Sequence, residues 1–308
     1  MQDLTIVMYH YIGPTADIKY PGIKSLELEG FKRQLDYLQE RFTIVNVDQI
    51  LAYINNKHAL PKKACWLTFD DGHKNHYKYV LPELKKRKLQ GSFFPPRDAI
   101  KNSNVLDVNS IHHILAKCNN LPKLRETLDK LCLEASIKRS ELKNFWKKYG
   151  VANRFDDEIT MYVKRMLQHA LSDENRNFII KKLFQEYVGV SQKELSDEIY
   201  MSVLEVCELV KEGMYVGSHG SGHYWLDKIT KENQREDIQD SLDFLEEVGA
   251  PTTNWVMCYP YGAYNSDTLS LIKSLGAKIG ITTKVSKANL DLDNQLLLPR
   301  LDTNDFPQ

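Results

Sequence analysis

The sequence predicts an α/β fold in which about seven parallel strands form a barrel, with a large helical insertion at about residues 100–213. Three observations predict this fold. Seven β-rich segments start near residues 5, 65, 91, 215, 255, 278 and 296, and most are separated by helical patterns. Polar side chains recur where these segments end, which is where the active site of a parallel α/β barrel lies. Between about 100 and 213 only helical patterns follow one another, so we expect one domain, 1–308, that contains this insertion.

The first hundred residues alternate between strand-like and helical patterns. The opening segment is rich in β-branched and aromatic residues and is broken by Gly13 and Pro14. Pro82 interrupts a later helical pattern, so we expect a kink or a new helix start there. The expected elements are a strand over 5–11, helices over 28–42 and 47–58, a buried strand over 65–71, a helix over 75–89 and a short strand over 91–96.

The remaining chain first loses its strands and then regains them. In the insertion, Ser172 and Ser191 precede acidic residues at the spacing of helix N-caps. The helices expected there cover 108–121, 122–133, 139–149, 157–171, 174–188 and 193–211. After them we expect a strand over 214–219, a helix over 230–248, a strand over 255–262, a helix over 265–275 and strands over 278–283 and 296–302.

Composition excludes several classes of function. The chain has 41 acidic and 41 basic residues, so its formal net charge is zero. This balance argues against general binding to nucleic acid or to an anionic membrane surface. No stretch is long and apolar enough to span a membrane, and Asp3 stands where a signal peptide would carry a basic residue. We therefore expect a cytoplasmic protein.

The segment with the most chemical information is Trp66–His73, a strand that runs into Asp70 and Asp71 before Gly72. Two adjacent carboxylates repel one another as anions, so one of them favours a cation. His219 and His223 follow another strand and are four residues apart, a spacing that brings both rings to one side of a helical turn. One aspartate with two histidines makes an open three-ligand site of the kind that catalytic zinc uses, and Co²⁺, Ni²⁺ or Fe²⁺ would also suit it.

These motifs together resemble the polysaccharide deacetylases, the NodB-homology group of carbohydrate esterase family 4. Thr68–Gly72 resembles the first motif of that family, and His219–His223 resembles the second, with Gly220 where a hydroxyl residue is usual. Tyr259–Gly262 resembles the third motif and Leu298–Asp302 the closing strand. Tyr9-His10 is similar to the opening of one branch of the family. The resemblance covers about 4–96 and 214–303 and implies a distorted (β/α) barrel.

The resemblance also implies roles for single residues. Asp71, His219 and His223 would bind the metal, and Asp70 would be the general base. The backbone N–H of Tyr261 would help to hold the oxyanion. In the branch with the Tyr-His opening the histidine lies at the active site, which makes His10 the candidate general acid.

The chain departs from the family pattern at two points. Cys258 replaces the third-motif arginine that orients the base, and no histidine follows His223. Arg300 is a candidate replacement from a neighbouring strand and a candidate substrate-binding residue. Trp225, Tyr259 and Tyr261 are candidates for contact with a sugar, although core packing is equally open for Trp225. We expect His73 and His76 to be solvated loop residues, although contact with substrate stays open for His73.

The expected function is therefore metal-dependent hydrolytic removal of an acetyl group, N-acetyl before O-acetyl, from a carbohydrate. Without a signal peptide, a lipid-linked or nucleotide-linked sugar is a more suitable substrate than a released polysaccharide. Two alternatives stay open. One is a hydrolase of a non-sugar amide on the same fold, and the other is a catalytically silent barrel that only binds glycan or metal.

Overall fold

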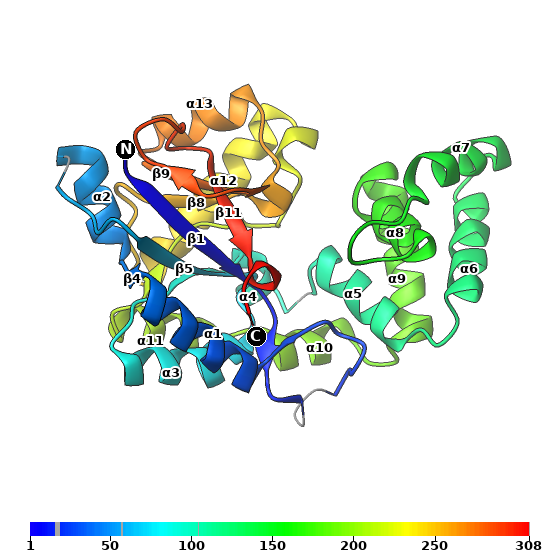
Figure 1. The fold of residues 1–308 in the computed structure, drawn as a ribbon. Helices are drawn as coiled ribbons and strands as arrows, with labels where there is room; N and C mark the ends of the chain where they lie inside the picture. The colour runs from blue at the N-terminus through cyan, green and yellow to red at the C-terminus, as the bar shows by residue number, and fades with distance from the viewer. Residues whose placement is uncertain (16–18, 57, 104, 308) are drawn as a thin grey trace. The chain divides into compact units, whose positions relative to one another are not determined.

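The computed structural model in Figure 1 describes residues 1–15, 19–56, 58–103 and 105–307, and it confirms the α/β fold. Its main sheet contains the seven expected strands, all paired in parallel. These strands are β1 (Asp3–Tyr9), β5 (Ala64–Asp70), β6 (Ser92–Phe94), β7 (Tyr215–Val216), β8 (Val256–Cys258), β9 (Ile279–Val285) and β11 (Leu298–Asp302).

The strands are ordered β7-β6-β5-β1-β11-β9-β8, and in Figure 1 β1 lies between β5 and β11. The two ends of this path meet at a single parallel bridge between Ser218 and Met257. Two backbone hydrogen bonds make the bridge, from Ser218 N to Val256 O at 3.1 Å and from Cys258 N to Ser218 O at 2.8 Å. The sheet therefore curls into a barrel whose two ends meet at this short contact. The short strands β4 (Thr43–Ile44) and β10 (Ala288–Asn289) pair with β5 and β1.

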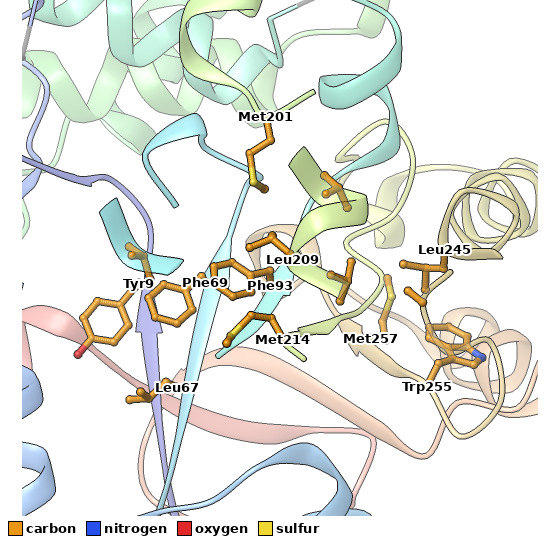
Figure 2. Packing of buried hydrophobic residues seen from close by; sticks show 14 of the residues in the cluster. Tyr9, Leu67, Phe69, Phe93, Met201, Leu209, Met214, Leu245, Trp255 and Met257 are labelled. Carbon is orange, nitrogen blue, oxygen red and sulfur yellow. The ribbon is translucent and has the colours of Figure 1, made fainter. Parts of the chain in front are cut away.

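Strand β5 shows how alternation places side chains in this barrel, because all seven of its residues are buried. One set of its side chains packs against the helices around the barrel, and the other set faces the barrel interior. Figure 2 shows Phe69 of the first set stacked between Tyr9 of β1 and Phe93 of β6. The ring centroids are 5.1 Å apart for Tyr9 and Phe69 and 4.8 Å apart for Phe69 and Phe93. Because Phe69 points outward, Asp70 points into the barrel interior.

Helices cover the outer side of the strands with their apolar faces. These are α1 (Leu28–Arg41), α3 (Leu81–Arg87), α11 (Val203–Lys211), α12 (Lys231–Glu247) and α13 (Ser266–Ser274), with the five-residue α4 (Arg97–Lys101) after β6. Helix α2 (Val47–Asn56) instead packs Val47 and Ile50 into the other buried cluster, which contains Ala64 and Trp66 of β5. The break expected at Pro82 is present, because a π-helical turn, η2 (His76–Val80), precedes α3. In the described part of the chain, no helix is both long enough and apolar enough to cross a membrane.

The chain divides into two compact units. The first contains the barrel and comprises Met1–Asp17, Ser25–Asn104 and Ser196–Gln308; the second comprises Ile18–Lys24 and Val105–Leu195. The second unit consists mainly of α5 (Asp107–Lys117), α6 (Leu121–Glu134), α7 (Arg139–Tyr149), α8 (Glu158–Arg165) and α9 (Asp173–Tyr187), with a π-turn, η3 (Met166–Ala170). The assignment of one domain with an insertion at about 100–213 stays our interpretation.

The single helix expected over 193–211 is wrong. The structure has α10 (Gln192–Ile199) and α11, separated at Tyr200–Ser202. Ser202 caps α11 and forms a capping box with Glu205. In the gap, the backbone N–H of Met201 donates to Gly72 O at 3.0 Å, and Tyr200 forms a bridge with His73. Tertiary pairing with the loop after β5 therefore overrides the helical pattern.

Candidate active site

Asp70 and Asp71 reach the same site because the strand ends between them. Asp70 is the last residue of β5 and points inward. Asp71 and Gly72 then both have positive φ, 70° and 69°, so the chain turns over two residues. Aspartate tolerates this left-handed conformation better than most residues, and glycine has no Cβ to oppose it. The turn brings the second carboxylate back toward the barrel interior, beside the first.

The structure brings Asp71, His219 and His223 together, and their ligand atoms all lie within 4.8 Å of one another. Oδ1 of Asp71 is 3.5 Å from Nε2 of His219 and 3.4 Å from Nε2 of His223. Ligands of a tetrahedral zinc ion lie about 2.0–2.2 Å from the ion and therefore roughly 3.3–3.6 Å from one another. The three side chains thus have the spacing that a divalent cation requires.

The contacts of His219 support the same conclusion. Its Nδ1 lies 2.6 Å from the carbonyl oxygen of Cys258, which can only accept a hydrogen bond, so Nδ1 carries the proton. In the neutral ring Nε2 is then the nitrogen with a free lone pair, and it faces Asp71. A metal-binding histidine is commonly fixed in this way by a second hydrogen bond.

The turn from His219 to His223 is not helical, contrary to the expectation from its spacing. Gly220 and His223 both have positive φ, 70° and 55°. The carboxylate of Asp237, on α12, accepts from the backbone N–H groups of Ser221 at 3.0 Å and Gly222 at 2.7 Å. Burial raises the pKa of Asp237 to about 6. No sequence pattern singles out this residue, because it belongs to an ordinary acidic helix face.

Asp70 forms a buried ion pair with Arg300, whose side chain is 1% exposed. Nη1 of the arginine donates to Oδ1 at 2.9 Å and Nη2 donates to Oδ2 at 2.8 Å. Thr282 O and Thr68 Oγ1 accept the other hydrogen bonds of the guanidinium. Burial raises the pKa of Asp70, but the charge and hydrogen bonds of Arg300, together with the nearby His10 and His219, outweigh this and hold it at about 2. Asp70 is therefore an anion at neutral pH, and Arg300 is directed at it.

His10 follows the last residue of β1 and lies beside this ion pair. Its Nε2 is 3.8 Å from Oδ2 of Asp70, and its side chain is 38% exposed, so it is open to solvent as well. The carbonyl of His10 accepts a hydrogen bond from Nε2 of His76 at 2.6 Å. The expectation that His73 and His76 are solvated is wrong, because both are buried in the loop and turn after β5. Burial lowers the pKa of His76 to about 3, which keeps it neutral.

The aromatic candidates separate into two groups. Trp225 stacks on Tyr261, with ring centroids 4.5 Å apart and planes 10° apart, and the Tyr261 ring also meets His223 at 4.7 Å. Tyr259 is fully buried in the outer layer, and its hydroxyl donates to Leu296 O at 2.8 Å. Since Cys258 faces the barrel interior, its neighbour Tyr259 faces outward. This position argues against the predicted contact between Tyr259 and substrate.

Comparison with known proteins identifies the family. The sequence profile described as polysaccharide deacetylase matches residues 57–126 and 151–280. The chain belongs to the polysaccharide deacetylase family. It is also 25% identical over 99 residues to YxkH of Bacillus subtilis (strain 168), a protein provisionally named as a polysaccharide deacetylase. That match covers 32% of this chain and 35% of YxkH, so the two are aligned over about a third of their lengths.

Solved structures share the fold. The Streptococcus pyogenes deacetylase PplD in complex with acetate has a TM-score of 0.57 and 19% identity, over 97% of this chain and 92% of PplD. IcaB from Ammonifex degensii has a TM-score of 0.57 and 18% identity, over 98% of this chain and 91% of IcaB. The de-N-acetylase from Aggregatibacter actinomycetemcomitans has the same TM-score and 15% identity, over 98% and 96% of the two chains.

Proposed function

We propose that this protein is a metal-dependent hydrolase that removes an acetyl group, with an N-acetylated sugar or glycan precursor as the expected substrate. The family supports deacetylation of a carbohydrate as the reaction class. The observation that carries the proposal is the ionised Asp70, paired with Arg300 directly beside the Asp71, His219 and His223 group. Catalytic sites of this kind need a charged base next to three ligands that leave coordination positions open.

In this proposal Asp71, His219 and His223 hold the cation. A bound divalent ion, with Zn²⁺ expected and Co²⁺, Ni²⁺ or Fe²⁺ also suited to these ligands, would polarise the acetyl carbonyl and acidify a water molecule. Asp70 takes the proton of the attacking water, and Arg300 keeps its carboxylate oriented and ionised. As the acetyl carbon–nitrogen bond breaks, His10 gives a proton to the leaving amine. The products are acetate and a free amino sugar.

The proposed substrate contacts lie next to His223. The backbone N–H of Tyr261 would receive the negative charge that develops on the carbonyl oxygen. The stacked rings of Trp225 and Tyr261 adjoin His223 and offer an aromatic surface for the apolar face of a sugar. The assignment to the branch with a Tyr-His opening and the cytoplasmic location stay predictions.

Acetate release tests the proposal. The purified protein is stripped with a chelator, reloaded with Zn²⁺, Co²⁺ or Ni²⁺, and incubated with N-acetylated and O-acetylated oligosaccharides and with lipid-linked and nucleotide-linked N-acetyl sugars. We expect release with at least one metal and one N-acetylated donor, and a loss of about 10²- to 10⁴-fold in Asp70→Asn, the range that general base catalysis contributes.

The two alternatives are outcomes of the same experiment. Release only from acylated amides without a sugar would identify a hydrolase of another amide class. No release from any donor with any metal, although the metal binds, would indicate a catalytically silent barrel. The intact Asp70–Arg300 ion pair favours catalysis over the silent alternative, because a binding protein has no need for a buried ionised base.

A further inference from the structure

His73 is a buried histidine that the proposed reaction does not use. Its side chain is 3% exposed. Among the described residues its Nε2 has no hydrogen-bond partner, although it lies close to the carboxylate of Asp71. The distance from Nε2 of His73 to Oδ2 of Asp71 is 3.5 Å. A buried ring nitrogen without a partner is costly, so its position beside a carboxylate calls for an explanation.

The two oxygens of Asp71 face different histidines. Oδ1 faces His219 and His223, whereas Oδ2 faces His73. Within the described residues, two groups of possible ligands have atoms that all lie within 4.8 Å of one another, Asp71 with His219 and His223, and Asp70 with His219 and Cys258. Neither group includes His73. His73 therefore lies behind the metal-binding carboxylate instead of beside the other ligands.

The ring of His73 is fixed from several sides. It stacks on Tyr11, with centroids 4.1 Å apart, and lies nearly parallel to the ring of Tyr200 at 6.2 Å. The backbone of His73 pairs with that of Tyr200, and the neighbouring Gly72 O accepts from Met201 N. This packing holds Nε2 toward Asp71 and leaves the ring few other orientations.

We propose that His73 is a positioning residue of the metal centre. Its Nε2–H donates to Oδ2 of Asp71 and so turns Oδ1 toward His219 and His223. The inference rests on the proposed metal-dependent function, because it gives His73 a role only through the ligand Asp71. Groups that orient a metal-binding carboxylate in this way typically contribute about 10- to 100-fold to metal affinity.

Two substitutions of similar length test the donor. Gln places an amide N–H near the position of Nε2, whereas Met fills similar space without a donor. We expect His73→Gln to bind Zn²⁺ within about threefold of the wild type and His73→Met to bind it about 10- to 100-fold more weakly, measured by competition with a chromophoric chelator. His73→Phe, which preserves a ring against Tyr11, gives a second variant without a donor should the first fail to fold.

His113→Phe is the matched control for introducing a phenylalanine. His113 is also buried and packs against a tyrosine, Tyr20, at 4.9 Å, but it lies in the second unit. We expect its zinc affinity to equal that of the wild type. The visible spectrum of the Co²⁺ form should keep its band positions in His73→Gln, since the direct ligands are unchanged.

The results separate two failures. If the wild-type protein binds no divalent metal, the proposed function fails. If the wild type binds Zn²⁺ and the folded methionine and phenylalanine variants bind it equally well, only the role of His73 fails. Equal weakening in the glutamine and methionine variants, or a changed Co²⁺ spectrum in His73→Gln, would also overturn the positioning role, because the ring itself would then be required.

Discussion

Arg300 reaches Asp70 across a strand, because β1 lies between β11 and β5 in the sheet. The two residues are 230 positions apart in sequence, and nothing in the local pattern around either one reveals the pairing. The family resemblance suggested Arg300 as a replacement for the arginine that orients the base, but only the strand order shows that the two inward-facing side chains meet across β1. Cys258, where the family pattern has arginine, is also inward-facing and buried.

Removal of the guanidinium should raise the pKa of Asp70, because burial is then opposed only by the weaker influence of His10 and His219. In Arg300→Gln we expect the acid limb of kcat/KM against pH to move to higher pH, since Asp70 must be ionised to act as the base. An uncompensated buried charge should also lower the free energy of unfolding by about 3–5 kcal/mol. Measured pH–rate profiles and thermal unfolding provide the check.

Arg87→Gln is the control for this experiment. Arg87, on α3, also pairs with two carboxylates, those of Asp36 and Glu83, but it lies outside the site. The acid limb of kcat/KM against pH in Arg87→Gln should match that of the wild type. An unshifted limb in Arg300→Gln would contradict the role of Arg300 in keeping the base ionised.

Tyr259 and Trp225 should respond differently to substitution, because only Trp225 adjoins the metal group through Tyr261. Tyr259→Phe removes a buried hydrogen bond to Leu296 O, so we expect a loss of about 1 kcal/mol in the free energy of unfolding and an unchanged KM. Trp225→Ala should raise KM for a sugar substrate by about tenfold, because it removes roughly 1.4 kcal/mol of stacking energy. A raised KM in Tyr259→Phe would indicate instead that Tyr259 contacts the substrate.

Periodicity predicts the strands and most helices of this chain well, because their apolar faces repeat with the period of the element itself. It fails where tertiary contacts decide the backbone. The break at Tyr200 follows from pairing with His73, and the burial of His73 and His76 follows from packing around the loop after β5. At the turn after β5 only Gly72 signals a left-handed conformation in the sequence, yet Asp71 adopts one as well.

The turn from His219 to His223 should be the most sensitive element to a small substitution. A Cβ at Gly220 would lie 2.6 Å from Oδ2 of Asp237, and φ there is +70°. We expect Gly220→Ala to weaken Zn²⁺ binding at least about tenfold and to lower the free energy of unfolding by more than the roughly 1–2 kcal/mol of left-handed strain alone. Metal competition and chemical denaturation measure the two effects.

Gly249→Ala isolates the strain from the clash. Gly249 has φ +76°, and a Cβ there would have no neighbour within 4 Å. The Gly249→Ala variant should have a lower free energy of unfolding than the wild type but the same affinity for Zn²⁺. Adding Asp237→Ala to Gly220→Ala removes the oxygen that the new Cβ meets, so the two changes should not be additive; additivity would show that no clash limits the turn.

The whole barrel closes through one bridge, between Ser218 and Met257, directly before His219. The proposed metal ligands come from two separate strand ends, Asp71 after β5 and the histidines after β7, and all of them belong to the first compact unit. A bound cation would therefore link two strands near this bridge. This arrangement predicts that metal stabilises the barrel and does not act on the second unit.

Hydrogen exchange with mass spectrometry tests this prediction region by region. At a free Zn²⁺ concentration of 100 times Kd, metal binding adds about 2.7 kcal/mol to the stability of the unit that binds the metal. Amides that exchange only when that unit unfolds should then exchange roughly 100-fold more slowly. We expect this protection in peptides that cover β5, β7 and the turn at 219–223, and no change in α5 to α9. Asp71→Asn should abolish the protection at the same metal concentration. Equal protection in the helices of the second unit would contradict the prediction, because it would require the insertion to unfold together with the barrel.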